Sequence, residues 1–256
     1  MGGAVELHHV VDGPEGAPVL VLAGSLGSTL EMWRPQVAAL AGAFRIVRLD
    51  HRGHGGSPAP PGPYRMADLA EDVLALLDRL ELPAVAWCGL SLGGMVGMYL
   101  GSTAPERLTS LTLCCTTAHF PDPQPWADRI AAVAAGGTEP IADAVVARWF
   151  TPDWAAAHPD QVAECRAMIA DTDDAGYLAC CQAIEVWDHR DQLRSVAVPT
   201  LVIGGAEDLA TPVEPHARTL ADGIPGARLE VVPGAHLATI ESAERTSTLI
   251  AAHASP

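Results

Sequence analysis

The stretch Ala84-Val85-Ala86-Trp87-Cys88-Gly89-Leu90-Ser91-Leu92-Gly93-Gly94 decides the fold of this chain. Its apolar first half is typical of a buried strand, and Leu92–Ser102 has the pattern of a helix. Between them lies the spelling G-x-S-x-G, which places a serine on a sharp, strained turn from strand to helix. Glycines are needed there because larger neighbours would collide. We predict that Ser91 is a nucleophile; the alternative is an ordinary serine in a glycine-rich contact between helix and strand.

Short apolar runs alternate with helical patterns on both sides of this stretch. Such alternation predicts an α/β fold with a mostly parallel sheet and helices on both faces. Val5–Val11 is predicted as a leading edge strand. Further strands are predicted at Pro18–Ala23, Phe44–Leu49, Ala84–Cys88, Leu108–Cys115, Pro199–Ile203 and Arg228–Val232, and helices at Met66–Leu80, Leu92–Ser102, Val213–Asp222 and Glu241–His253.

One segment interrupts the alternation. From about Phe120 to Arg190 the pattern is helical, with prolines at its start and no convincing strand. We interpret residues 120–193 as a helical cap inserted into a core made of residues 1–119 and 194–256. Open α/β sheets bind ligands beyond their strand ends, so the cap is expected to roof a pocket there.

A catalytic serine needs a histidine base and an acid that orients the base. For a serine on this kind of turn, the expected order along the chain is serine, acid, histidine. Asp208 lies in the loop after a predicted strand and is preferred to Glu207, because Leu209–Pro212 follows it into the next helix. The alternative is that Asp208 only caps a helix or a turn.

The base is predicted to be His236, in the loop directly after the strand Arg228–Val232. His216 falls within a predicted helix, and His253 lies in the tail. Asp208 would accept a hydrogen bond from one ring nitrogen of His236 and leave the other free to take the Ser91 proton.

Two backbone N–H groups must face the negative oxygen that forms during attack on a carbonyl. One is predicted from Leu92, the residue after the nucleophile. The other is expected in the loop Gly24-Ser25-Leu26-Gly27 after an early strand, from Leu26 first and Ser25 second.

The charge of the chain restricts its partners. The formal net charge is −16, and the fifteen basic residues are all arginine. A charge of this sign repels nucleic acids and anionic membranes. Schiff-base and serine–lysine chemistry are excluded because both require a lysine. We expect a small-molecule lactone or ester substrate, no nucleic-acid or membrane partner, and a monomer or small homo-oligomer.

The sequence favours a cytoplasmic protein. Met1–Val10 has no basic start and no long apolar run, and stretches such as Pro18–Ala23 are too short to span a bilayer. The cysteines include two adjacent pairs and no CxxC spacing, so they are interpreted as buried thiols in a reducing compartment; they are Cys88, Cys114, Cys115, Cys165, Cys180 and Cys181.

The run Asp50-His51-Arg52-Gly53-His54-Gly55 raises the question of a metal site. His51 and His54 are spaced for it, but the loop offers no plausible third and fourth ligand. We interpret it as a structural loop with charge-assisted hydrogen bonds. No metal and no cofactor are expected.

Segments along essentially the whole chain are shared with one known family. They are Gly24–Ser28, Met32–Gln36, Asp50–Gly55, Cys88–Ser91, Arg148–Pro152, Tyr177–Ile184 and Ala206–Asp208. In them the chain resembles the 3-oxoadipate enol-lactonases, which have the α/β-hydrolase fold. Arg148–Pro152 and Gly176–Cys181 are the most specific, since many hydrolases share the motifs of the triad. Gly24 stands where the family usually has asparagine. The chain resembles the family members that are not fused to a second domain.

The resemblance implies a cofactor-free reaction of bacterial aromatic catabolism. An unsaturated lactone with an acetate arm is opened through an acyl-enzyme on Ser91 to give 3-oxoadipate. It also implies that Trp126 and Arg129, three apart on the first cap helix, face the pocket. Arg129 is the first candidate for the substrate carboxylate and Arg148 the second, with Trp149 beside it. Alternatively, Arg129 is a solvated surface residue and Trp126 part of the cap core.

Other functions are compatible with the same triad. A general esterase, a carbon–carbon bond hydrolase or a perhydrolase would retain the scaffold and change the substrate. Dehalogenase and epoxide hydrolase chemistry is disfavoured because it needs a carboxylate in place of Ser91. A hydrolase-like ligand receptor without activity is the alternative from a different class, and measurable turnover would exclude it.

Overall fold

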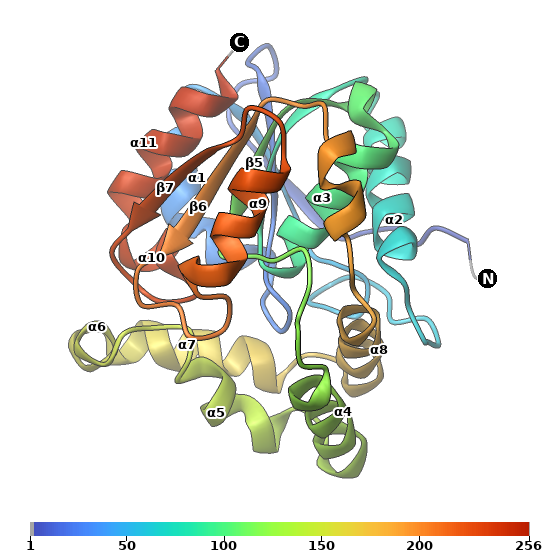
Figure 1. Cartoon of the computed structure of the whole chain (residues 1–256), viewed down its shortest axis with the longest axis vertical. Coiled ribbons are helices and arrows are strands. Elements are labelled where there is room, and N and C mark those ends of the chain that lie inside the picture. The colour runs from blue at the N-terminus through green and yellow to red at the C-terminus, as the bar shows by residue number, and fades with distance from the viewer. Residues whose placement is uncertain (1–2, 256) are drawn as a thin grey trace.

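A seven-stranded sheet runs through the centre of the protein, whose computed structural model describes residues 3–255 (Figure 1). The strand order is β1-β3-β2-β4-β5-β6-β7. β1 is antiparallel to β3, and all other neighbours are parallel. The strands are β1 (His9–Asp12), β2 (Val19–Ala23), β3 (Arg45–Leu49), β4 (Val85–Leu90), β5 (Leu108–Cys114), β6 (Thr200–Gly205) and β7 (Arg228–Val232). The predicted α/β class is confirmed.

Helices cover both faces of this sheet (Figure 1). α1 and α11 pack together on one face, and α2, α3 and α9 lie on the other. These helices and the short turns between them are α1 (Arg34–Leu40), α2 (Met66–Arg79), α3 (Leu92–Thr103), α9 (Arg218–Gly223), α10 (Ala238–Glu241), α11 (Ala243–Ala254), the 3-10 turns at Leu30–Trp33, Pro105–Arg107 and Arg190–Ser195, and a π-helical turn at Val213–Ala217. Because both faces are covered, β4 and β6 are buried along their whole length.

The chain between β5 and β6 forms a separate group of helices below the sheet (Figure 1). These cap helices are α4 (Gln124–Gly136), α5 (Ala142–Val146), α6 (Pro152–Ala157), α7 (Pro159–Ala170) and α8 (Asp174–Glu185), with a 3-10 turn at Glu139–Ile141. A β-bridge between His119 and Asp188 joins the two points where the chain enters and leaves them. The boundaries 120 and 193 of the cap as a separate unit stay a prediction.

Three predicted elements differ in the structure. The edge strand begins at His9 rather than Val5, because the Val5 N–H donates to Asp72 Oδ1 (2.7 Å) instead of to a strand. The helix predicted at Val213–Asp222 is broken at Glu214 (φ −103°, ψ 123°), since the residue before a proline avoids helical angles. The helix predicted at Glu241–His253 is interrupted at Ser242, whose hydroxyl donates to the Pro233 carbonyl (2.7 Å).

Two helices were not predicted from the sequence. α1 and α10 have seven and four residues, too short for a clear helical period. Within residues 3–255, no helix has both the length and the apolar character needed to cross a membrane.

Candidate active site

Ser91 occupies the turn between β4 and α3, in a conformation that few residues other than glycine adopt (φ 55°, ψ −110°). The turn is crowded on both sides: a Cβ on Gly89 would collide with the Gly93 backbone, and a Cβ on Gly93 with the Ala23 carbonyl. The Ser91 N–H donates to the Cys114 carbonyl (3.0 Å). These contacts hold the serine in its strained position, as the G-x-S-x-G pattern predicts.

Asp208 and His236 come from the loops after β6 and β7 and are both almost completely buried. The Nδ1 atom of His236 lies 2.9 Å from Oδ2 of Asp208, which also accepts a hydrogen bond from the Thr211 hydroxyl (2.7 Å). Oδ1 accepts from the backbone N–H groups of Ala210 (2.7 Å) and Thr211 (3.0 Å). Asp208 therefore shapes its own turn and orients the histidine at the same time.

The Asp208 carboxyl is held ionised. Burial raises its pKa, but the charge and hydrogen bond of His236 and the hydrogen bonds from Thr211 outweigh this and lower the pKa to about 2. The ordinary value is 3.8, so the carboxylate favours the folded state above about pH 4, and this contribution is lost as the pH falls towards 2.

The two predicted oxyanion donors lie on neighbouring backbone segments. Leu92 begins α3, where a backbone N–H has no acceptor within the helix. Leu26 belongs to the loop after β2, and the Gly93 N–H ties that loop to α3 through the Gly24 carbonyl (3.0 Å). Leu26 also lines the pocket, whereas the Leu92 side chain is buried.

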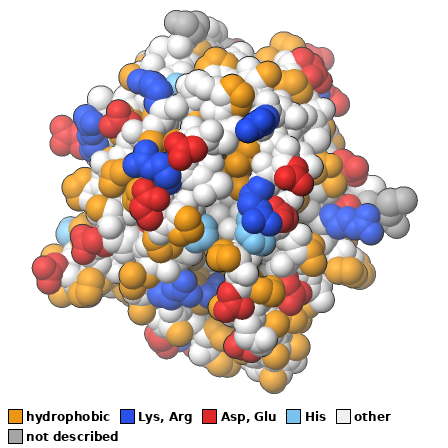
Figure 2. Space-filling view, in the orientation of Figure 1, with side chains coloured by type: hydrophobic (Ala, Val, Ile, Leu, Met, Phe, Trp, Pro, Cys, Tyr) orange, Lys and Arg blue, Asp and Glu red, His pale blue; other side chains and the backbone are white. Residues whose placement is uncertain are grey.

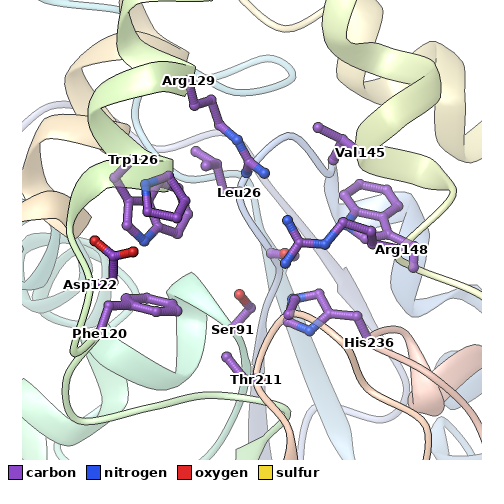
Figure 3. Close-up of a pocket in the computed structure, with 14 residues that line it drawn as sticks. Leu26, Ser91, Phe120, Asp122, Trp126, Arg129, Val145, Arg148, Thr211 and His236 are labelled. Carbon is purple, nitrogen blue, oxygen red and sulfur yellow. The ribbon is translucent and has the colours of Figure 1, made fainter.

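A pocket lies between the core and the cap helices, with Ser91 and His236 side by side at its floor (Figure 3). The space inside it, counted together with its open mouth, is about 780 Å³. The lining residues are Ser25, Leu26, Ser91, Phe120, Asp122, Pro125, Trp126, Arg129, Val145, Arg148, Trp149, Ala210, Thr211 and His236. The structure thus brings the predicted substrate-binding residues together with the predicted nucleophile and base.

Arg129 and Arg148 point into the pocket from two different cap segments, above Ser91 and His236 (Figure 3). Within residues 3–255 neither guanidinium has a carboxylate within 4.0 Å. Burial and the nearby Arg129 charge lower the pKa of Arg148. Basic and histidine side chains gather where the cap helices meet the core (Figure 2). Arg148 donates to the Leu209 carbonyl (3.3 Å), and Asp122 also lines the pocket, but neither arginine is in contact with a carboxylate of the described residues. The two cations therefore make this part of the pocket attractive to an anion.

An aromatic side chain packs against Arg129. Trp126 packs edge-on against Phe120, and the Arg129 guanidinium lies 4.9 Å from the centre of the Trp126 ring. Trp149 is 3% exposed, and its carbonyl accepts from the Leu237 N–H (2.9 Å), next to His236. Trp126 therefore lines the pocket rather than only the interior of the cap.

Comparison with known proteins identifies the family. The family model described as the alpha/beta hydrolase fold matches residues 17–243. The chain belongs to the α/β-hydrolase family. "3-Oxoadipate enol-lactonase 2" of Acinetobacter baylyi is 36% identical over 93% of this chain and 88% of its own length. The predicted resemblance is thereby confirmed, and this α/β hydrolase is an enzyme.

Solved structures agree with this assignment. The enol-lactonase from Burkholderia xenovorans LB400 superposes with a TM-score of 0.95 at 40% identity, covering 97% of this chain and 96% of that one. The relatives of this α/β hydrolase are not confined to one reaction: a "putative carbamate hydrolase" of Variovorax paradoxus is 31% identical over 93% of this chain and 91% of its own length.

Sequence reasoning missed several residues of the pocket in this α/β hydrolase, notably Phe120, Asp122, Val145 and Thr211. Only Thr211 left a signal, since a hydroxyl residue three positions after an aspartate is typical of a side-chain-capped turn. The others reach the pocket through the packing of the cap helices, which no local pattern reveals.

The loop Asp50–Gly55 was interpreted as structural, and its hydrogen bonds agree with that interpretation. Arg52 donates to both carboxylate oxygens of buried Asp72 (2.6 and 2.7 Å). Both ring nitrogens of His54 are occupied by the backbone. Among residues 3–255, no cluster of metal-ligating side chains is present, and the six cysteines are buried free thiols.

Proposed function

We propose that this hydrolase opens 3-oxoadipate enol-lactone to 3-oxoadipate, in the catabolism of aromatic compounds. The single observation that carries the proposal is that Arg129 and Arg148, which contact no carboxylate among residues 3–255, face the predicted triad in a chain of net charge −16. A substrate with a carboxylate arm would supply the anion that contacts these two arginines. The similarity to enol-lactonases supports the same substrate.

The first half of the proposed reaction is attack on the lactone carbonyl. His236 Nε2 takes the proton of Ser91 Oγ while Asp208 holds the opposite ring nitrogen, and Oγ bonds to the carbonyl carbon. The N–H groups of Leu26 and Leu92 stabilise the negative oxygen. The ring C–O bond then breaks to give an acyl-enzyme and an enolate. His236 passes the proton that it received from Ser91 to the enolate, which becomes the ketone, and is neutral again.

The second half releases the product. His236 takes a proton from a water molecule, whose oxygen attacks the acyl carbon, and the Ser91–acyl bond breaks. Ser91 recovers its proton from His236, and 3-oxoadipate leaves with two carboxylates. The carboxylate arm stays near Arg129 and Arg148 throughout, so the pocket orients the same molecule in both halves.

The experiment that tests this function compares three substrates. We expect kcat/KM to be about ten- to a hundredfold higher for the enol-lactone acid than for its methyl ester, because a charge-assisted hydrogen bond contributes about 1.5–3 kcal/mol. A p-nitrophenyl ester reports the general esterase activity under the same conditions. Equal values for the acid and its methyl ester would replace the enol-lactonase assignment with that of a general esterase.

Replacing Arg129 should remove carboxylate recognition without harming the triad. For Arg129→Ala we expect kcat/KM for the acid to fall by about ten- to a hundredfold, with the p-nitrophenyl ester nearly unaffected. Arg194→Ala is the matched control, because Arg194 is exposed on the core and its loss changes the net charge equally. If Arg129→Ala slowed both substrates alike, Arg129 would be a support of the cap rather than a ligand of the carboxylate.

A further inference from the structure

Two buried histidines contact the loop that carries the predicted oxyanion donor. The loop Gly24-Ser25-Leu26-Gly27 follows β2, and its two ends are contacted by His51 and His54. Both histidines come from the loop after β3 and are 3% and 1% exposed. Neither lines the pocket, so neither can touch the substrate.

His54 holds the Gly27 end of the loop. Its Nε2 atom accepts a hydrogen bond from the Gly27 N–H (2.9 Å), so this nitrogen carries no proton. Its Nδ1–H then donates to the Arg52 carbonyl (3.1 Å). The two contacts define one neutral tautomer, since a protonated ring would place an N–H against the Gly27 N–H. Burial lowers the pKa of His54 and favours this neutral form.

His51 holds the Gly24 end of the same loop. Its Nε2–H donates to the Gly24 carbonyl (3.3 Å), which also accepts from the Gly93 N–H (3.0 Å) on the turn after Ser91. Burial, aided by the neighbouring His54, lowers the pKa of His51 to about 3, so this ring is neutral too. The rings meet edge-on, with centres 6.4 Å apart.

Ser28 also holds this loop: its N–H (3.1 Å) and its hydroxyl (2.8 Å) both donate to the Ser25 carbonyl. Gly27 has a positive φ of 78°, and a Cβ there would lie 3.0 Å from the Tyr177 ring of α8. A Cβ on Gly24 would lie 2.5 Å from Ser28 Oγ. The space around the loop is thus filled by side chains, and hydrogen bonds at Gly24, Ser25 and Gly27 fix its course.

We infer that His54, together with His51, is a positioning residue that aims the Leu26 N–H at the oxyanion. Ser28 holds the carbonyl of the peptide between Ser25 and Leu26, and the two histidine rings hold the ends of the loop, so this peptide plane has little freedom to rotate. A donor that is oriented before the reaction stabilises the transition state more than one that must reorient. This inference rests on the proposed acyl-enzyme mechanism but not on the identity of the lactone.

The test separates the two hydrogen bonds of His54. In His54→Gln the amide oxygen is placed near the former Nε2 and can still accept from Gly27. In His54→Asn the amide nitrogen replaces Nδ1, and the Gly27 acceptor is lost. With a p-nitrophenyl ester we expect His54→Asn to lower kcat by about ten- to a hundredfold with KM within about twofold, because loss of a whole oxyanion donor costs about 10²–10³. His54→Gln should recover most of the loss.

A second readout reports the oxyanion itself. A trifluoromethyl ketone that forms a tetrahedral adduct with Ser91 should bind His54→Asn more weakly by the same factor as the loss in kcat, whereas binding of 3-oxoadipate should not change. His189→Leu is the control for loss of a buried histidine, because His189 is 5% exposed and bonds to Ser102 away from the pocket. It should retain the wild-type kcat.

Several outcomes would overturn the positioning role. The first is a folded His54→Asn variant with wild-type kcat. The second is a kcat for His54→Gln as low as that for His54→Asn. The third is an effect of His54→Asn on KM alone. If His54→Asn does not fold, His51→Gln and His51→Leu test the contact at Gly24 instead. Only the glutamine variant can still donate to the Gly24 carbonyl, so only the leucine variant should lose kcat. If the wild type hydrolyses the p-nitrophenyl ester but not the enol-lactone, the proposed substrate is refuted. The effect of the His54 variants can still be measured with the ester.

Discussion

Ser91→Ala is expected to lower kcat for the enol-lactone by roughly 10⁵- to 10⁶-fold while the protein stays folded. The hydroxyl is the reacting group in the proposed mechanism, so without it neither the acyl-enzyme nor its hydrolysis can proceed. The fold is unaffected because alanine fits the same space, and both residues meet the same strained φ of 55°. Steady-state kinetics and thermal denaturation measure the two effects separately.

A fluorophosphonate gives this prediction a control. It should attach to Ser91 in the wild type, as peptide mass spectrometry would show, and should not attach to Ser91→Ala. Ser102→Ala is the matched variant, because Ser102 lies on the same helix and its hydroxyl bonds to Tyr99 and His189 outside the pocket. Labelling of another residue together with complete inactivation would refute Ser91 as the nucleophile.

Asp208→Asn is expected to lower kcat by about 10⁴-fold, a loss that shape alone would not predict. Oδ1 faces two backbone N–H groups, from Ala210 and Thr211, so the amide oxygen of asparagine must occupy that position. The amide NH₂ group then faces His236 Nδ1 and donates to it. The histidine proton is forced onto Nε2. A protonated Nε2 cannot accept the proton of Ser91.

The neighbouring acid provides the control for this variant. Glu207→Gln changes the charge equally, but the Glu207 side chain is exposed, and kcat should stay within about twofold of wild type. The KM of Asp208→Asn should change little, because Asp208 does not line the pocket. A large loss in Glu207→Gln with a small one in Asp208→Asn would reverse the assignment of the acid.

Local patterns predicted the parts of the fold that depend on short-range sterics. The G-x-S-x-G spelling lies within five residues, and a Cβ on Gly89 would collide with the nearby Gly93 backbone, whereas glycine at 93 is required by the Ala23 carbonyl of β2. β7 has the predicted bounds, and the other parallel strands agree to within two residues at either end, because buried parallel strands are continuously apolar. Asp208 and His236 are paired from chain order together with their positions in loops after predicted strands, and their 2.9 Å contact agrees with this pairing.

Elements that make one specific competing contact were predicted less well. Ser242 ends α10 because its hydroxyl bonds to Pro233, and Glu214 leaves the helix because Pro215 follows it. Val5 is drawn away from the sheet by Asp72 on α2. Each exception comes from one specific contact or one proline that the average hydrophobic period does not represent.

By itself, the sequence determined the sheet, the turn that carries Ser91 and the order of the predicted triad, because these depend on local sterics and on the apolar pattern along the chain. Only the tertiary structure decided that Arg129 and Arg148 meet above Ser91, and that His51 and His54 attach to the two ends of the Leu26 loop. The physical reason is that these contacts join segments far apart in the sequence. The distance between such segments is set by the packing of whole helices and loops, and no single stretch of sequence encodes it.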